Sequence, residues 1–128
     1  MQDFMNNKRS GTAFEKEVCK YLANKGYWVH FMSPDERGAQ PFDVIAVKNK
    51  IAYAIECKVS EKDKFPISRL EDNQHYSFIR WKKCHNTEPL IAIKYGKNIV
   101  FVEYSYLLEK KTIDLKEEIS CPSCTLFD

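Results

Sequence analysis

Two acidic residues and a lysine fall close together on two segments that look like paired strands. Asp43 begins one segment, and Glu56 and Lys58 lie two residues apart on the next. If these segments form a hairpin, Glu56 and Lys58 share one face and Asp43 lies beside them. Two carboxylates with open coordination positions suit Mg²⁺ or Mn²⁺, and such an ion polarises a phosphodiester and activates its bound water. The three residues therefore predict a candidate metal site for phosphodiester hydrolysis.

The spacing alone is weak evidence. An acidic residue two positions before a lysine occurs three times, at Glu56, Glu109 and Asp114, and an ordinary cross-strand charge pair has the same pattern. Of these, Glu56 lies on a predicted strand that has an aspartate on its partner strand. Lys58 would need a lowered pKa to act as a base, so holding the water or offsetting phosphate charge is an equal alternative.

Two more polar residues lie on predicted helices. Glu15 follows Thr12 at the spacing of a capping box, which explains the glutamate without a catalytic role. Gln74 falls between Leu70 and Phe78 on an apolar helical stripe, where an amide needs hydrogen-bond partners or a polar cavity. A glutamine satisfied within the core is the other explanation.

The hydrophobic pattern predicts the elements that position these residues. We expect helices over 12–25, 65–83 and 104–111, with Gly26 as the left-handed residue that ends the first. We expect strands over 27–32, 42–47, 51–59, 90–95 and 99–102. Helices flanking a mixed central sheet follow from this order, which predicts an α/β fold of the αβββαβ kind.

Length and composition limit the class of protein. The 128 residues are 44% hydrophobic and 30% charged, which is enough for one domain and too little for two. We expect a single domain over 1–128, with its core over about 10–111 and a C-terminal tail over 112–128. The net charge of +2 does not by itself indicate nucleic acid. Without a long apolar run or a signal-peptide pattern, a cytoplasmic protein without membrane contact is expected.

Five cysteines are scattered along the chain, and an odd number in apolar segments favours reduced thiols. Cys121 and Cys124 form a CxxC pair, which Cys84 and His85 could complete as a four-ligand zinc site. A zinc or redox module is thus one alternative for the C-terminal region, and a flexible tail is the simpler one.

Five stretches, taken in order, carry a resemblance to a known family. They are Gly11-Thr12-Ala13-Phe14-Glu15, the loop at Ser33, Pro41-Phe42-Asp43, Glu56-Cys57-Lys58, and Phe65-Pro66 through Gln74. Together they resemble the PD-(D/E)XK nuclease superfamily, and most closely its Holliday-junction resolvases of the RecU and archaeal Hjc type. The resemblance covers about residues 10–105 and implies a restriction-endonuclease-like fold.

The resemblance also implies a role for each matching residue. Glu15, Asp43 and Glu56 would bind Mg²⁺, with the main-chain carbonyl of Cys57 as a further ligand. Lys58 would assist the attack of water. Gln74 resembles a family glutamine on the helix after the motif, and Ser33 is the nearest match to an active-site serine or threonine. The implied activity is cleavage of branched DNA, a four-way junction, by a homodimer.

Two departures from the resolvase pattern leave other activities open. Chains of the RecU type usually have His-Gln where this one has Asn73-Gln74, and this chain shows no long protruding insertion. A restriction or repair nuclease for another DNA form is therefore one alternative. A DNA-binding protein that kept the fold without catalysis is the other.

Basic residues follow the motif strand and continue along the next predicted helix. They are Lys62, Lys64, Arg69, Arg80, Lys82 and Lys83. Their position beside the carboxylates predicts contacts to DNA phosphates, and a solvated helix face is the alternative.

Overall fold

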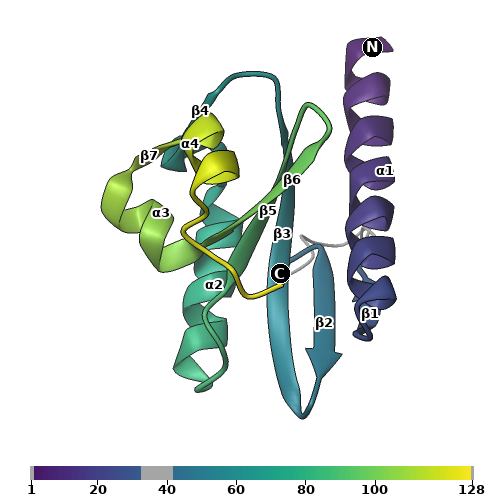
Figure 1. The fold of residues 1–128 in the computed structure, drawn as a ribbon, viewed down its shortest axis with the longest axis vertical. Helices are drawn as coiled ribbons and strands as arrows, with labels where there is room; N and C mark the ends of the chain where they lie inside the picture. The colour runs from purple at the N-terminus through teal and green to yellow at the C-terminus, as the bar shows by residue number, and fades with distance from the viewer. Residues whose placement is uncertain (1, 33–41, 128) are drawn as a thin grey trace.

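A five-stranded mixed sheet forms the centre of the computed structural model, which describes residues 2–32 and 42–127, the first eleven of these by backbone alone (Figure 1). The strands lie in the order β1-β2-β3-β5-β6. β3 and β5 pair in parallel, and the other neighbours are antiparallel. The strands are β1 (Trp28–Phe31), β2 (Val44–Lys48), β3 (Ile51–Ser60), β5 (Leu90–Tyr95) and β6 (Asn98–Glu103).

Helices cover both faces of the sheet (Figure 1). α1 (Gln2–Asn24) lies on one face, and α2 (Asp72–Lys83), α3 (Tyr104–Lys110) and α4 (Leu115–Ser120) lie on the other. β4 (Lys64–Pro66) and β7 (Thr112–Asp114) form a separate two-stranded sheet, and the short helix η1 (Ile67–Arg69) follows β4. The expected αβββαβ order with a mixed, helix-flanked sheet is confirmed. No helix in the described part of the chain is long and apolar enough to span a bilayer.

Each face of the sheet has its own apolar core, because side chains alternate along every strand. The α1 core joins Phe14, Val18 and Leu22 of α1 to Val44, Ile55 and Leu90 of the sheet. The α2 core joins Ala54, Ile91 and Ile93 of the sheet to Phe65, Phe78 and Leu107. Since Ala54 belongs to the α2 core and Ile55 to the α1 core, Glu56 points to the α2 side.

The first helix begins at Gln2 rather than at residue 12. The sequence 2–24 contains no proline, and one glycine costs only about 1 kcal/mol inside a helix, so Gly11 does not end it. Thr12 therefore lies within α1 and cannot be its N-cap. The capping-box explanation of Glu15 is wrong. The predicted C-terminus is confirmed to within one residue, because α1 ends at Asn24 and Gly26 follows two positions later with φ 91°.

The second long helix begins at Asp72 rather than at residue 65. Pro66 is extended, with φ −86° and ψ 155°, and pairs with Thr112 in the small sheet. Leu70 is extended as well, so it does not share a helical stripe with Gln74. Instead, Glu71 and Gln74 form a reciprocal capping box that starts the helix.

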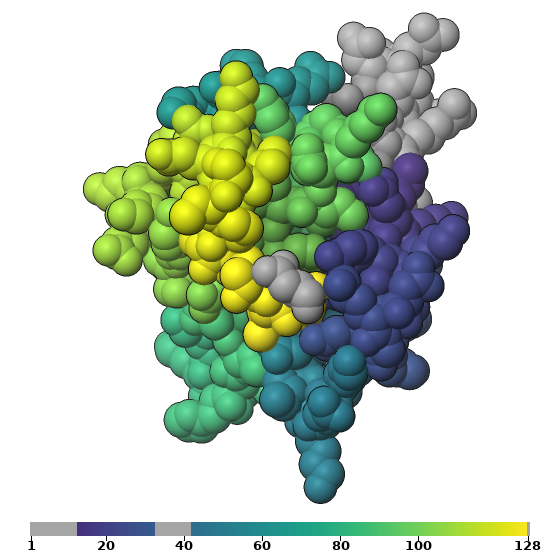
Figure 2. Space-filling model, viewed as in Figure 1, coloured from purple at the N-terminus to yellow at the C-terminus, as the bar shows by residue number. Residues whose placement is uncertain are grey.

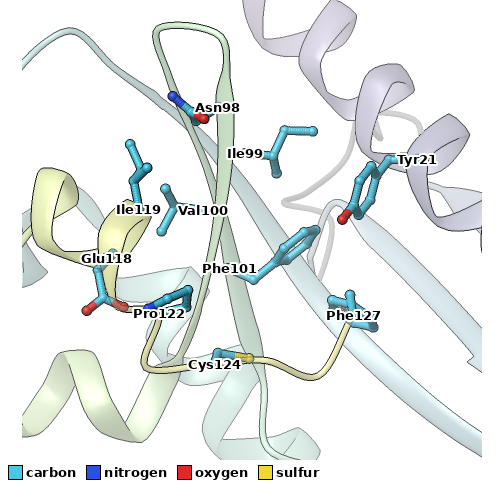
Figure 3. Close-up of a pocket in the computed structure, with 10 residues that line it drawn as sticks. All are labelled: Tyr21, Asn98, Ile99, Val100, Phe101, Glu118, Ile119, Pro122, Cys124 and Phe127. Carbon is cyan, nitrogen blue, oxygen red and sulfur yellow. The ribbon is translucent and has the colours of Figure 1, made fainter.

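The segment after residue 111, for which no element was predicted, forms β7 and α4 and then crosses the edge strand β6. Leu115 lies in the α2 core and Phe127 in the α1 core, so the segment passes from one face of the sheet to the other. Figure 2 shows this segment in yellow alongside the green hairpin, with its lower end next to the purple α1. A hollow of about 130 Å³ remains between this segment, β6 and Tyr21 (Figure 3).

Phe127 is the apolar anchor of this crossing segment and is 4% exposed. Its ring packs edge-on against Tyr27, Tyr53 and Phe101, with centroid distances of 5.4, 5.6 and 4.8 Å. Rings in this geometry attract one another beyond their burial alone. The contacts tie the C-terminal segment to the α1 face.

Replacing the anchor should destabilise the whole domain. We expect Phe127→Ala to lower the free energy of unfolding by about 3 kcal/mol, because a buried ring is lost and a cavity is left. Leu126→Ala removes a neighbouring side chain that is 45% exposed and should change it by less than about 0.5 kcal/mol. Urea unfolding at equilibrium measures both, and equal effects would contradict an anchoring role.

Candidate active site

The acidic residues meet where β2 separates from β3. The two strands are paired from Lys48 to Val44, while β3 continues to Ser60 alongside β5. Asp43 precedes the first paired residue, so its side chain lies at the opening between the strands. Its Oδ2 accepts a hydrogen bond of 2.8 Å from the main-chain N–H of Cys57. A carboxylate therefore binds the N–H that a longer β2 would have paired.

Glu56 approaches the same opening from the α2 side. Glu56 is only 4% exposed. Its Oε1 accepts a hydrogen bond of 2.7 Å from Nε2 of Gln74. The other end of the Gln74 amide, Oε1, accepts a hydrogen bond of 2.8 Å from the main-chain N–H of Glu71. Gln74 is therefore fixed at both ends and holds the Glu56 carboxyl.

Glu15 reaches Asp43 from α1, on the opposite face of the sheet. The pKa of Glu15 is raised to about 7; burial is the largest cause, followed by the negative charge of Asp43 and a hydrogen bond with it. The three carboxyl groups thus come from a helix, a strand opening and a strand interior. Asp43 hydrogen-bonds to both others, and the charge of Glu15 also acts on Glu56.

The pKa of Glu56 is also raised, well above its usual value. Burial is the largest cause, followed by the charge of Asp43 and a hydrogen bond with it, and the ammonium of Lys58 acts in the opposite direction. Glu56 consequently holds a proton at neutral pH when no cation is present. The site gathers more negative charge than its surroundings can solvate, which is the electrostatic condition that a bound cation relieves.

The oxygen-rich donor set fits a hard divalent cation. Among the described residues, no group of three or more His, Cys, Asp or Glu side chains is already spaced to hold a metal ion. Glu15 and Glu56 each hydrogen-bond to Asp43. A cation would take the place of these shared protons. The C=O of Cys57 points to the same edge of β3 as its N–H, and hence toward Asp43, since both groups of a strand residue point the same way.

Lys58 lies on the same face of β3 as Glu56, as expected from the alternation. It pairs in register with Ile93 of the α2 core, and its charge lowers the pKa of Glu56. The ammonium is therefore close enough to act on charge at the site. Ser33, the remaining predicted catalytic residue, lies outside the described residues.

Four of the six predicted DNA-binding residues make contacts within the protein. Lys64 pairs with Asp114 at 2.8 Å, and Lys82 pairs with Glu88 at 3.0 Å. Arg69 donates a hydrogen bond of 2.8 Å to the carbonyl of Val59. The guanidinium of Arg80 lies 5.7 Å from the ring centre of Tyr76. Lys62 and Lys83 are exposed, and neither makes a salt bridge with the described residues.

The zinc alternative does not agree with the structure. No group of three or more metal-binding side chains is found among the described residues, which include all five cysteines. Cys84 ends α2, whereas Cys124 packs against the α1 core. The CxxC pair and the Cys84-His85 pair are therefore on different parts of the fold.

Sequence reasoning missed Glu71, which positions Gln74 through its main-chain N–H and its capping box. The spacing of three residues between Glu71 and Gln74 is that of a capping box and was the available signal. A serine or threonine is the usual first residue of this motif, so the glutamate at position 71 did not indicate a capping box.

Comparisons of sequence find relatives over most of the chain. A family model described as archaeal Holliday junction resolvase (Hjc) matches residues 6–125. The crossover junction endodeoxyribonuclease of Sulfolobus islandicus rod-shaped virus 1 is 27% identical over 119 residues, covering 90% of this chain and 93% of the relative. The Hjc crossover junction endodeoxyribonuclease of Methanocaldococcus jannaschii is 29% identical over 94 residues, covering 73% of this chain and 65% of the relative.

The fold also resembles a solved structure. The Holliday junction resolvase Hjc of Archaeoglobus fulgidus superposes with a TM-score of 0.64 at 18% sequence identity, covering 81% of this chain and 86% of that one. At this identity the likeness concerns the fold.

The crowded carboxyls predict a pH-dependent gain in stability when Asp43 loses its charge. The raised pKa values of Glu15 and Glu56 mean that their stabilising contribution is present below the ordinary value of 4.5 and is lost as the pH rises. Asp43→Asn keeps an acceptor for the Cys57 N–H and removes the repelling charge. At pH 8 without divalent cations, we expect the free energy of unfolding of this variant to be about 1 kcal/mol higher than that of the natural protein. At pH 4 we expect no gain.

Urea unfolding in the presence of a chelator at the two pH values measures this difference. Glu109→Gln removes an exposed charge on α3 and serves as the control, with no comparable gain. A less stable Asp43→Asn protein at pH 8 would show that the three carboxyls do not repel one another.

Proposed function

Because the chain belongs to the archaeal Holliday junction resolvase family, a branch of the PD-(D/E)XK nucleases, we propose that it is an endonuclease that cuts four-way DNA junctions. The observation that carries the proposal is the meeting of Glu15, Asp43 and Glu56, from three separate elements, with the ammonium of Lys58 beside them. A protein that only binds DNA gains nothing from clustered carboxylates, which repel phosphates.

The metal is Mg²⁺ or Mn²⁺, held by the carboxylates of Glu15, Asp43 and Glu56 and by the carbonyl of Cys57. When bound, such an ion polarises the phosphodiester and makes water a better nucleophile. Mg²⁺ favours oxygen donors and retains several waters, which agrees with a site that supplies only oxygens.

The protein's own groups then have distinct tasks. Lys58 offsets the negative charge that develops on the phosphate, or holds the attacking water. Gln74 keeps the Glu56 carboxylate in place through its hydrogen bond of 2.7 Å and is a positioning residue. Ser33 is retained as a loop contribution to the site.

The DNA follows the basic residues beside the site. Lys62, Arg80 and Lys83 make phosphate contacts, since no carboxylate of the described residues forms a salt bridge with them. Lys64, Arg69 and Lys82 contribute less, because each is already held by a protein group. The active form is a homodimer, because a symmetric cut in two strands of a junction needs two sites.

Neutralising the carboxylates should abolish cleavage without abolishing binding. We expect Asp43→Asn and Glu56→Gln each to cut a four-way junction at least about 1000-fold more slowly with Mg²⁺, because the charge that holds the ion is lost. Both variants should still bind the junction, with Glu109→Gln as the fully active control. Gel assays of junction, duplex and flap DNA, with and without Mg²⁺, measure this.

The substrate panel separates the proposal from its alternatives. Preferential cutting of the junction supports a resolvase, and equal cutting of all three DNA forms indicates a general nuclease. Undiminished cleavage by Asp43→Asn would exclude this site altogether.

The basic residues should differ in their effect on salt dependence. We expect Lys62→Ala and Lys83→Ala each to reduce the slope of log affinity against log salt by about one, because each loses a phosphate contact. Lys64→Ala is the matched control and should change the slope less, since Lys64 is paired with Asp114. Titrations of junction DNA at several salt concentrations measure the slopes, and equal slopes for all three variants would contradict the assignment.

The dimer is tested independently of activity. Sedimentation equilibrium at micromolar concentration should give a mass of two chains. A monomer that persists when junction DNA is bound would contradict it.

A further inference from the structure

The edge strand β1 carries two exposed aromatic rings. Trp28 is 63% exposed, and its ring is stacked with that of His30, at a centroid distance of 6.3 Å and an interplanar angle of 15°. A large indole left in water is unusual unless it has a partner. We call these two residues the β1 platform.

The β1 platform lies on the same face of the sheet as Glu56. His30 is opposite Ile45, and Ile45 is opposite Ala54, which belongs to the α2 core. Glu56 follows Ala54 by two residues on that face. His30 is therefore two strand spacings and one side-chain repeat from Glu56, or roughly 12 Å, and Trp28, which is aligned with Ala52, is one repeat farther, at roughly 17 Å.

The other residues of β1 exclude the α1 face as the location. Val29 and Phe31 pack against the α1 core, and because side chains alternate, Trp28 and His30 must point the opposite way. Trp81 and Phe42 of the α2 core lie in contact with each other further in. The platform therefore lies at the outer edge of the sheet face that carries Glu56.

The strands beside the platform carry few charged groups. Residues 18–32 and 44–55 contain no aspartate or glutamate, and Lys50 lies in the β2–β3 turn. Lys25 and Lys48 are on the α1 side, because Lys25 lies over the ring of Tyr21 and Lys48 lies over the ring of Tyr27 and donates a hydrogen bond to the carbonyl of Lys25. Glu88 is next to Thr87, whose hydroxyl bonds the carbonyl of Ala52, and Asp43 lies beside the end of β1, where its carbonyl accepts a hydrogen bond from the N–H of Met32. Glu88 is paired with Lys82 and with the N–H of Ser105.

We propose that the β1 platform stacks on the base pair exposed at the branch point of a four-way junction. This proposal rests on the proposed function. Every base pair inside a continuous duplex is stacked on both sides, whereas a pair at an open branch point presents one free face. Aromatic stacking on that face tolerates any base. The platform therefore distinguishes a junction from a duplex without reading sequence.

The test compares binding of two DNA forms without divalent cations, so that nothing is cut. We expect Trp28→Ala to weaken binding of a four-way junction by about tenfold and binding of a duplex with the same arm sequence by less than about twofold. Trp28→Phe keeps an aromatic ring and should stay within about threefold of the natural protein. Leu108→Ala removes a side chain that is 44% exposed on α3 and serves as the control.

A second measurement follows the indole itself. In Trp81→Phe, Trp28 is the remaining tryptophan, since the chain has two. Its emission should be quenched when junction DNA is added and should stay nearly constant with duplex DNA. This readout does not depend on the stability of the Trp28→Ala variant.

The outcomes separate the two proposals. Equal losses for junction and duplex after Trp28→Ala would assign the platform to general DNA contact and overturn the inference. If Trp28→Ala changed the oligomeric mass of the protein in the absence of DNA, the platform would be a contact with a second copy of the chain. That result would also overturn the inference. No loss at all would also overturn it, while the resolvase activity would stand. A natural protein that neither prefers nor cuts junctions would overturn both.

Discussion

The repulsion among three carboxyl groups at one point is the constraint on which the rest of the fold depends. A separate element holds each of them there. α1 is held by its apolar stripe, and Asp43 accepts a hydrogen bond from the Cys57 N–H at the end of β2. Gln74 of α2 donates a hydrogen bond to Glu56. Burial prevents water from screening them, and this raises the pKa values of Glu15 and Glu56. Under the proposed function, a divalent cation would relieve this local instability, and a cost in stability of this kind is usual for an active site.

The sheet and its carboxylates were predictable because their signals are local. The alternation along Ile51–Ser60 placed Glu56 and Lys58 on one face, and the turn before it paired this strand with that of Asp43. Glu15 was less predictable, because a capping box with Thr12 also explains a glutamate at this position. The start of α1 at Gln2 excludes that capping box. The predicted stripe of Gln74 is wrong for Leu70, which precedes α2, whereas Gln74 and Phe78 do lie four residues apart on this helix. The requirement that the Gln74 amide find a partner is confirmed.

The remainder depended on contacts between distant parts of the chain. The parallel pairing of β3 with β5 and the small sheet of β4 with β7 join residues far apart in sequence, and periodicity contains no information about such partners. The C-terminal elements were missed for the same reason, since β7 is three residues long and α4 is six. A proline at position 66 favours the start of a helix, but it is equally compatible with the extended backbone that Pro66 adopts.

The position of Phe127 has a consequence for how the protein is made. Its ring completes a cluster whose other members include Phe14, Val18 and Leu22, so the earliest and latest synthesised parts of the domain share one core. A nascent chain on the ribosome can assemble the hairpins as they emerge, but it cannot close this cluster until residue 127 has left the exit tunnel. The α1 face of a partly translated chain therefore stays open, and chaperones that recognise exposed aromatic surface would find their binding site there.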